Sequence, residues 1–458
     1  MNMEITKELK WRVLNHLYLG YILSGAVITI FGAILPHLIE EEQLNYAVAG
    51  GLISILAIGN FCASIIYPLA KRHFSHRAVV VAITSLSPIV MFLLTIHPPV
   101  VFMYLLVFVL GITKGTVTII NNLAMNVATN SSTKYLNILH TTFAVGAFAS
   151  PFIMAALLAL GFPWRIIMYI LCVSGAIFPL NYWTMDYRML EEPQPSAANA
   201  DDHRADGCST AEPAGTTSSV AATTTPADTT APTDATGSAA AASSAAQGGD
   251  GSGVGCIEQG QPAGAPNLQA LLTNRSFLII TFIMFMYVGF ENTVNGWFVT
   301  YLKDTGVMTS ALATAMVSVT WIMMMAGRMG TAQLLQNVNK LHIILVSALI
   351  DFVAIVLLVN THTATMAAII IAVLGLGMSA IYPTTVAAAG PIIEGSTMGL
   401  SLLTGISAIG GIVVPQIIGI LADAVGIAGA MVTVVLTVGI MLALSILAVL
   451  RDRRGLMG

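Results

Sequence analysis

Twelve long runs of apolar residues dominate this sequence and limit what the chain can fold into. A helix needs about 20 mostly apolar residues to cross the hydrocarbon core of a bilayer. The runs lie near residues 14–38, 46–70, 78–96, 99–127, 137–160, 163–185, 275–301, 309–334, 341–359, 363–388, 397–421 and 426–450. Six precede a long break and six follow it. The sequence therefore predicts an all-α integral membrane protein with 12 transmembrane helices in two six-helix halves.

The small share of charged residues excludes several classes of protein. Only 9% of the residues are Asp, Glu, Lys or Arg, against about 25% in an ordinary soluble domain. So few charges could not cover a water-exposed surface. The composition therefore argues against a soluble enzyme, a nucleic-acid-binding protein and a secreted disulfide scaffold. The net charge of −4 says little about binding partners, because many of the acidic residues lie in the break between the two sets of runs.

The break between the two sets of runs has a different composition. Residues 218–245 are almost entirely Ala, Thr, Ser, Pro, Asp and Gly. Such a segment has too few apolar groups to offset its chain entropy, so we expect it to be disordered. The predicted organisation is an N-terminal half over 1–190, a disordered cytoplasmic linker over 191–270 and a C-terminal half over 271–458.

The positions of the basic residues predict the orientation in the membrane. If the N-terminus is cytoplasmic, all but four of the 18 Lys and Arg residues lie on the cytoplasmic side. Arg165 and Lys303 lie outside, and Lys114 and Arg328 lie within spans. Because cytoplasmic loops are rich in Lys and Arg, we expect both termini and the linker to lie in the cytoplasm. We expect the protein to lie in the plasma or inner membrane.

The two halves share a sequence register. Gly146 and Pro151 of the fifth run match Gly410 and Pro415 of the eleventh at an offset of 264 residues. The same offset places Gly111 of the fourth run on Gly375 of the tenth. Duplicated halves are typical of secondary transporters, in which one half rocks against the other around a site at the bilayer midplane.

Several local motifs carry a resemblance to a known family. They are Leu136-Asn137-Ile-Leu-His140 with Phe143-Ala-Val-Gly146-Ala147, Gly289-Phe-Glu291 with Trp297 and Tyr301, Gly327-Arg328, Gly375-Leu-Gly377, and Tyr382-Pro383-Thr384. With this layout the chain resembles the major facilitator superfamily, and within it the fucose/glucose/galactose permease-like branch of sugar–proton symporters. Fucose permeases place a carboxylate one turn before an Asn on span 4, where this chain has Val117 and Thr118.

The resemblance implies an arrangement of the spans around a central cavity. Spans 1, 4, 7 and 10 would line the cavity, and spans 3, 6, 9 and 12 would support them from outside. Lys114 on span 4 and Glu291 on span 7 would then face the cavity from opposite halves. Trp297, Trp321 and Tyr382 could stack on a sugar ring, and Tyr382 on span 10 is the best placed of the three.

Helical spacing groups polar residues near these two charges. One stripe contains Lys114, Thr118 and Asn121 or Asn122, and another contains Tyr287, Glu291 and Asn295. Such stripes would bind a polar solute in an otherwise apolar bundle. The predicted substrate-binding residues are Lys114, Thr118, Asn121, Asn122, Tyr287, Asn292, Asn295 and Tyr382.

Ionisable groups inside a membrane are costly and usually mark a transport pathway or an ion pair. We expect Glu291 to carry the coupling proton, and Lys114 to bind an anionic group of the solute or to pair with ionised Glu291. The alternative is a fixed salt bridge between the halves that stabilises one gate. Arg328 and Asp351 are predicted to form a structural ion pair, with a proton-coupling role of Asp351 as the second possibility.

The sequence favours a secondary transporter that imports a small solute, a sugar or a related polar metabolite, together with protons. A proton-antiport exporter of drugs or metabolites with the same fold is the alternative, because fold does not fix function. The 23 Met residues would suit its adaptable apolar cavity. A sensor, an intramembrane enzyme or a channel is disfavoured. We expect no catalytic residues, no metal site and no cofactor, and the predicted partners of a monomer are the solute, protons and the lipid bilayer.

Overall fold

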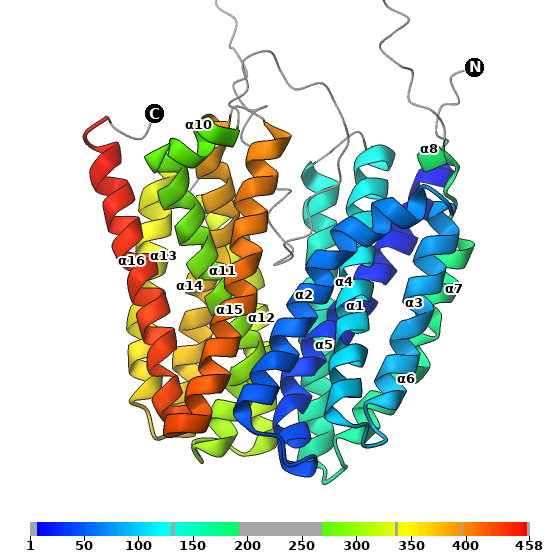
Figure 1. Ribbon diagram of the computed structural model, residues 1–458, viewed down its shortest axis with the longest axis horizontal. Helices are drawn as coiled ribbons and strands as arrows, with labels where there is room; N and C mark the ends of the chain where they lie inside the picture. The colour runs from blue at the N-terminus through cyan, green and yellow to red at the C-terminus, as the bar shows by residue number, and fades with distance from the viewer. Residues whose placement is uncertain (1–6, 130–132, 192–267, 335–337, 394–395, 456–458) are drawn as a thin grey trace, which may run out of the picture.

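The chain folds into long helices that run side by side (Figure 1). The structure is a computed structural model and describes residues 7–129, 133–191, 268–334, 338–393 and 396–455. Every regular element in those ranges is a helix. Twelve helical segments are long and apolar enough to cross a membrane, which confirms the predicted twelve-span fold.

Each half contributes six spans. The first half consists of α1 (Lys7–Glu41), α2 (Tyr46–Lys71), α3 (His76–Leu93), α4 (Val100–Thr129), α5 (Thr133–Ala159), a sixth span made of α6 (Arg165–Gly175) and α7 (Ile177–Thr184), and the short α8 (Arg188–Glu191). The second half consists of the short α10 (Leu268–Thr273), then α11 (Arg275–Asp304), α12 (Ser310–Leu334), α13 (Lys340–Val359), α14 (Ala364–Ile393), α15 (Thr397–Ala430) and α16 (Val432–Asp452). Most of the predicted linker, 192–267, lies outside the described residues.

Polar side chains fix where several spans begin. Asn45, Ser75, Asn274, Asn339 and Ser396 each accept a hydrogen bond from a backbone N–H in the first turn of α2, α3, α11, α13 and α15. Such a cap satisfies a donor that has no partner within the helix. α15 is interrupted near its end at Gly426, whose φ of +76° suits a residue without a Cβ.

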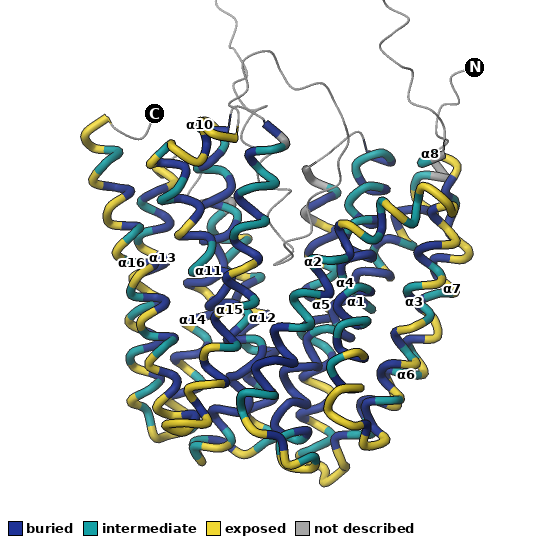
Figure 2. The backbone as a smooth tube through the Cα atoms, in the orientation of Figure 1, coloured by how far each residue is buried: buried dark blue, intermediate teal, exposed yellow. Residues whose placement is uncertain are grey.

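Burial separates inner spans from outer spans. In α1 and α11, 67% of the most apolar window is buried, whereas the value is 39% for the third, sixth and twelfth spans. Figure 2 shows the same contrast, with buried residues concentrated along the inner helices. Large apolar side chains on the outer spans, including Trp183, Val346 and Leu436, are exposed. An apolar outer surface of this kind suits contact with lipid chains.

Close helix contacts recur in both halves with the 264-residue offset seen in the sequence. A Cβ added to Gly111 of α4 would overlap the carbonyl oxygen of Leu56, and one added to Gly375 of α14 would meet the equivalent oxygen of Thr320. Gly146 of α5 lies equally close to the backbone of α1, and Gly410 of α15 to that of α11. The repeated contacts support duplicated halves, in which small residues let helix backbones approach closely.

The halves are joined most closely at one end of the bundle. We call the end where α1 begins and α16 ends the termini side, and the opposite end the far side (Figure 1). Contacts between the halves on the far side include those of Tyr46 with Asp304 (2.9 Å), Ser310 with His37 (3.1 Å), Gln416 with the Ala47 carbonyl (3.3 Å), and Lys303 with Glu40. Toward the termini side the ribbons of the two halves diverge (Figure 1). The structure is therefore closed on the far side.

Asp423 of α15 contributes a further far-side contact between the halves. Its two carboxylate oxygens accept hydrogen bonds from the backbone N–H groups of Tyr46 and Ala47, at 2.7 and 3.0 Å. These are free donors in the first turn of α2, where a negative charge is also favoured by the helix dipole.

We expect the Asp423→Ala variant to weaken far-side closure. Loss of a capping side chain costs about 1 kcal/mol, which shifts an equilibrium about fivefold toward the far-side-open state. Spin labels on the far-side ends of α2 and α15 would report that shift as a larger share of long distances. Asp452→Ala is the control, because Asp452 bonds to Asn339 within the second half. An unchanged distance distribution in Asp423→Ala would contradict the assigned role.

Candidate functional site

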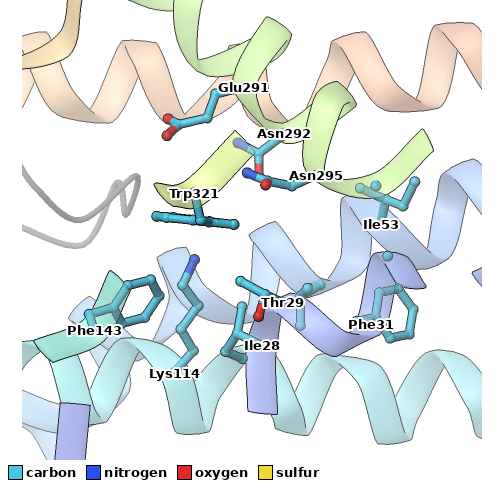
Figure 3. Close-up of a pocket in the computed structure, with 13 residues that line it drawn as sticks. Ile28, Thr29, Phe31, Ile53, Lys114, Phe143, Glu291, Asn292, Asn295 and Trp321 are labelled. Carbon is cyan, nitrogen blue, oxygen red and sulfur yellow. The ribbon is translucent and has the colours of Figure 1, made fainter. Parts of the chain in front are cut away.

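A cavity of about 70 Å³ lies between the halves at mid-depth (Figure 3). Six helices contribute to it, namely α1, α2, α4 and α5 of the first half and α11 and α12 of the second. Its lining consists of Ile28, Thr29, Phe31, Gly32, Ile53, Leu56, Lys114, Phe143, Glu291, Asn292, Asn295, Gly296 and Trp321. Because it is walled by both halves, its shape depends on how they are placed relative to one another.

Two charged side chains line this cavity, and they come from opposite halves. Lys114 projects from α4 and Glu291 from α11, and the Trp321 ring lies between them in the view of Figure 3. Glu291 is buried, with 5% of its surface exposed, and Lys114 is half-buried. The structure thus brings together the two residues that the sequence singled out as facing charges.

The polar lining on the second half comes from a single stretch of α11. Glu291 and Asn295 are one turn apart and Asn292 lies beside them, so all three reach the cavity. The Asn292 amide donates to the Val288 carbonyl at 3.0 Å, which fixes its orientation. The predicted solute residues Asn292 and Asn295 therefore do line the cavity.

A second, smaller cavity of about 30 Å³ adjoins the same residues. It is lined by Leu56, Ala57, Asn60, Lys114, Val288, Asn292 and Ala408. Lys114, Leu56 and Asn292 line both cavities. The Oδ1 atom of Asn60 is buried and has no hydrogen-bond partner among the described residues. An acceptor in this position is available to a water molecule or to a polar group of a solute.

Three predicted solute residues on α4 lie outside both linings. Asn121 is fully buried, donates to the Leu17 carbonyl at 3.2 Å and accepts from the Tyr182 hydroxyl at 2.8 Å. Asn122 accepts from the Tyr21 hydroxyl at 3.5 Å, and Thr118 is buried. The stripe runs toward the termini side, where α4 packs on α1, and its asparagines hydrogen-bond to residues of α1 and α7.

We expect replacement of Asn121 by Leu to lower stability without changing solute affinity. The change leaves the buried Leu17 carbonyl and the Tyr182 hydroxyl without this partner, at a cost of about 1–3 kcal/mol. Thermal unfolding in detergent should show a lower midpoint, while the KM for uptake stays unchanged. A raised KM at unchanged stability would place Asn121 in the solute site after all.

Tyr287 and Tyr382 lie behind the cavity wall and do not line it. Tyr287 is fully buried, and its hydroxyl donates to the Met378 carbonyl at 3.0 Å. The Tyr287 and Tyr382 rings are 6.3 Å apart between centroids. The aromatic side chains that line the cavity are Phe31, Phe143 and Trp321, whereas Tyr382 and Trp297 are not among the lining residues.

The structure does not bring Arg328 and Asp351 into the predicted ion pair. Asp351 of α13 is fully buried and packs against Gly377 of α14, where an added Cβ would overlap its carboxylate. Neither carboxylate oxygen has a hydrogen-bond partner among the described residues. The difference arises because α13 directs Asp351 toward α14 rather than toward α12.

The sequence alone gave no reason to select Thr29, Phe143 or Asn60. Thr29 donates to the Gly25 carbonyl at 2.8 Å, a common bond for a Thr within a helix. Phe143 is one of 17 Phe residues, and its contact with Trp321 (5.8 Å between centroids) depends on the opposite half. In the part of the chain that the structure describes, no group of three or more His, Cys, Asp or Glu residues could hold a metal ion.

Comparison with known proteins identifies the family. The family model described as Major Facilitator Superfamily matches residues 17–415, which is most of the chain. The chain belongs to the major facilitator superfamily. It is therefore a membrane transporter of small molecules, as the sequence predicted, and the cavity between the halves lies where secondary transporters of this design place their sites.

Solved structures of other transporters share this fold. The nucleoside transporter NupG has a TM-score of 0.64 at 14% identity, over 98% of each chain. A bacterial homologue of the human lysosomal transporter Spinster has a TM-score of 0.65 at 14% identity in its inward-facing occupied conformation and 0.62 at 15% identity in its unoccupied one, over 97% of each chain. At such low identity the likeness shows the fold alone. Compared by sequence, the chain matches none of the curated proteins.

Proposed function

We propose that this transporter imports a small polar solute together with protons, by exposing the central cavity first to one side of the membrane and then to the other. The observation that carries this proposal is the pair of opposite charges, Lys114 and Glu291, in one cavity shared by both halves. Opposite charges on two rocking halves can approach and separate as the halves move. Protonation and solute binding can then bias that movement.

Glu291 is the proposed proton carrier. When Glu291 is ionised, it balances the Lys114 charge in the cavity. Protonation of Glu291 weakens its attraction for Lys114, which favours an electronegative group of the solute at the ammonium, and the amides of Asn292 and Asn295 supply further hydrogen bonds. The proton and the solute thus enter the cavity together because each is favoured by the presence of the other.

Asp351 is a second candidate for holding a proton. It is fully buried and lacks a hydrogen-bond partner among the described residues, and an unpaired carboxylate in such a place is costly. Tyr287 is one turn from Glu291 on α11, and its hydroxyl bonds to the Met378 carbonyl, next to the Gly377 against which Asp351 packs.

We infer that the termini side is cytoplasmic, because the Lys and Arg residues are concentrated there. The far side then faces outward across the plasma or inner membrane, and the structure represents a state closed to the outside. A monomer suffices for this cycle, because one chain supplies both halves and the whole cavity. The resemblance to sugar permeases and the fold shared with a nucleoside transporter support a polar metabolite as the solute.

The exporter alternative receives less support from the cavity. An adaptable apolar cavity for drugs would draw on methionine side chains. None of the 13 lining residues is Met, and five of them carry an amide, a hydroxyl, an ammonium or a carboxylate group. Proton movement in the direction opposite to the solute would nevertheless favour the exporter alternative.

Accumulation driven by a proton gradient tests the proposal. The purified protein in liposomes should accumulate at least one radiolabelled solute from a panel of sugars, nucleosides and small organic acids when the outside is made acidic. A protonophore should abolish that accumulation. Equal solute concentrations inside and outside, with or without the gradient, would contradict proton coupling.

A further inference from the structure

We propose that Ser54 and Ser318 are the pivots on which the two halves rock, through two equivalent hydrogen bonds that hold while the far side opens and closes. Both are positioning residues, because neither lines a cavity and together they fix the line about which the halves turn. This inference rests on the proposed alternation of the central cavity between the two sides of the membrane.

Two pairs of helices bring the halves together. α2 packs against α15, and α5 packs against α12 (Figure 1). In the first pair the Ser54 hydroxyl donates to the Ile412 carbonyl at 2.7 Å. In the second pair the Ser318 hydroxyl donates to the Phe148 carbonyl, also at 2.7 Å. Each bond therefore joins a side chain of one half to the backbone of the other half.

The two bonds are related by the duplication of the chain. The offset of 264 residues that relates the halves places Ser54 on Ser318, and it also places Phe148 on Ile412. Donor and acceptor are thus both repeated, and each half supplies one of each. Because the halves of a transporter of this superfamily are repeats about an axis along the membrane normal, the two bonds lie at the same depth on opposite sides of that axis.

Both bonds lie at the edge of the central cavity. Each serine lies eight residues after the first residue of its helix, which is about 12 Å from the far-side end. Ile53, the residue before Ser54, lines the cavity. Trp321, one turn after Ser318, lines it as well. The cavity therefore lies beside the line that joins the two bonds.

The two serine hydroxyls are not used in the way that is usual within a helix. A serine there commonly bonds to a carbonyl of its own preceding turn, as Ser407 of α15 does to the Leu403 carbonyl at 2.6 Å. Ser54 and Ser318 direct their hydroxyls to the other half instead. Both residues are buried, so bulk water does not replace these bonds.

A pair of such bonds can act as a turning line. Rotation of one half about the line through both bonds leaves both bond lengths unchanged, whereas contacts away from that line lengthen or shorten. A hydroxyl turns about its Cβ–Oγ bond, and a carbonyl accepts hydrogen bonds over a broad range of directions. The two bonds can therefore tolerate the change of angle between the helices that they join.

The packing of α2 on α15 differs on the two sides of Ser54. Toward the far side the backbones touch, since a Cβ added to Gly419 would overlap the Tyr46 carbonyl. Toward the termini side Asn60 of α2 and Ala408 of α15 both line the smaller cavity. The Ser54 bond thus lies where close contact between the two helices ends, as a pivot requires.

Two far-side bonds between α2 and α15 have no counterpart between α5 and α12. Gln416 donates to the Ala47 carbonyl, but the 264-residue offset places Phe152, which has no side-chain donor, at the position equivalent to Gln416. The same offset places Ala159 at the position equivalent to Asp423. A contact that closes one side is needed only once, whereas a turning line needs two points. The repetition therefore distinguishes the serine bonds from the closing contacts.

Cross-links at two depths between the same helices test the proposal. In the full chain without its native cysteines, one variant carries Ser54→Cys and Ile412→Cys. The matched control carries Ala47→Cys and Gln416→Cys. Each pair is joined by a short bifunctional methanethiosulfonate, and Asp423→Ala is included in both to populate the far-side-open state. Spin labels attached through p-acetylphenylalanine at the far-side ends of α1 and α11 then measure the opening.

We expect the link at Ser54 to leave the share of long far-side distances within about twofold of the unlinked protein, and the control link to remove the long distances. Loss of the long distances with the Ser54 link would overturn the pivot and leave alternating access intact. Failure of that pair to cross-link, where the control pair does, would overturn it as well. If the unlinked protein never shows long distances, the halves do not rock and the proposed function falls with this inference.

Removal of the two hydroxyls is a second test. Loss of a bond that exists in one state only shifts the ratio of open to closed protein roughly 2- to 12-fold. The double variant Ser54→Ala/Ser318→Ala should keep that ratio within about twofold of the wild type, because both states lose the same bonds. It should also unfold at a lower temperature than the matched control Ser407→Ala/Ser445→Ala, whose hydroxyls bond within their own helices. A larger shift of the ratio, or equal unfolding temperatures, would overturn the proposal.

Discussion

The Glu291→Gln variant is expected to lose proton-driven accumulation of solute entirely, down to the level of protein-free liposomes, while it still exchanges solute across the membrane. Glutamine has nearly the shape of a protonated glutamate but cannot release a proton. The variant should therefore close around the solute as the wild type does, with Lys114 paired to it. It should fail to close when empty, because the cavity has then lost the carboxylate that faces Lys114 from the opposite half.

Two assays separate these effects. Uptake driven by an acid exterior measures coupled accumulation, and exchange of internal unlabelled solute for external labelled solute measures closure around the solute alone. Glu42→Gln is the matched control, since Glu42 pairs with His97 on the far side and lies outside the cavity. Accumulation that persists in Glu291→Gln would remove this residue from coupling, and Asp351→Asn would then be the next variant to measure.

Replacing Gly32 with alanine is expected to trap the transporter open on its far side. A Cβ on Gly32 of α1 would overlap the carbonyl oxygen of Asn295, and it would lie 3.3 Å from the Cα of Gly296, both on α11 of the other half. Backbone atoms cannot move aside as the end of a flexible side chain can. Overpacking of this kind costs about 1–3 kcal/mol or more, so the far-side-closed population should fall roughly 5- to 150-fold.

The expected readout is slower transport with a wider far side. Spin-label distances between the far-side ends of α1 and α11 should lengthen, and uptake should fall by a similar factor. Gly405→Ala of α15 is the matched control, because an added Cβ there meets nothing within 4 Å. Unchanged distances and uptake in Gly32→Ala would show that the halves do not close through this contact.

The transmembrane architecture was predictable because it depends on the length and spacing of apolar runs. Each run is long enough to satisfy its own backbone hydrogen bonds across a bilayer, which no other local structure does. The duplication was visible in Gly146 and Gly410, whose small size is needed wherever α5 meets α1 and α15 meets α11. The break of the sixth span at Ala176 was not predicted, although Gly175 precedes it and Pro179 cannot donate a hydrogen bond to the Gly175 carbonyl.

The charged residues of the site were predictable for a related reason. A Lys or Glu in the middle of an apolar span is too costly to face lipid, so Lys114 and Glu291 had to face the interior. Helical spacing from Glu291 then placed Asn295 in the cavity, but it also suggested Tyr287, which the structure turns toward α14. Helical spacing predicts which residues share one face of a helix. How much of that face lines the cavity depends on the packing of neighbouring helices.

Residues that depend on contacts between distant spans were not predictable. The contacts of Asn121 and Asp351 are made with Tyr182 on α7 and with Gly377 on α14, respectively. No local sequence pattern links these positions. Trp321 is one of five Trp residues, and its indole N–H, which has no hydrogen-bond partner among the described residues, becomes informative only when the cavity is known. Neutral polar and aromatic residues are frequent in packed spans, so their type alone does not reveal a site.

Access to the central cavity from each side of the membrane tests the account most directly. Leu56 lines both cavities, and a Leu56→Cys variant without the native cysteines can be labelled by a membrane-impermeant maleimide in oriented proteoliposomes. We expect fast labelling from the termini side, labelling at least roughly tenfold slower from the far side, and the opposite preference when Gly32→Ala is added. Equal fast labelling from both sides, unaffected by Gly32→Ala, would show an open pore and contradict alternating access at this cavity.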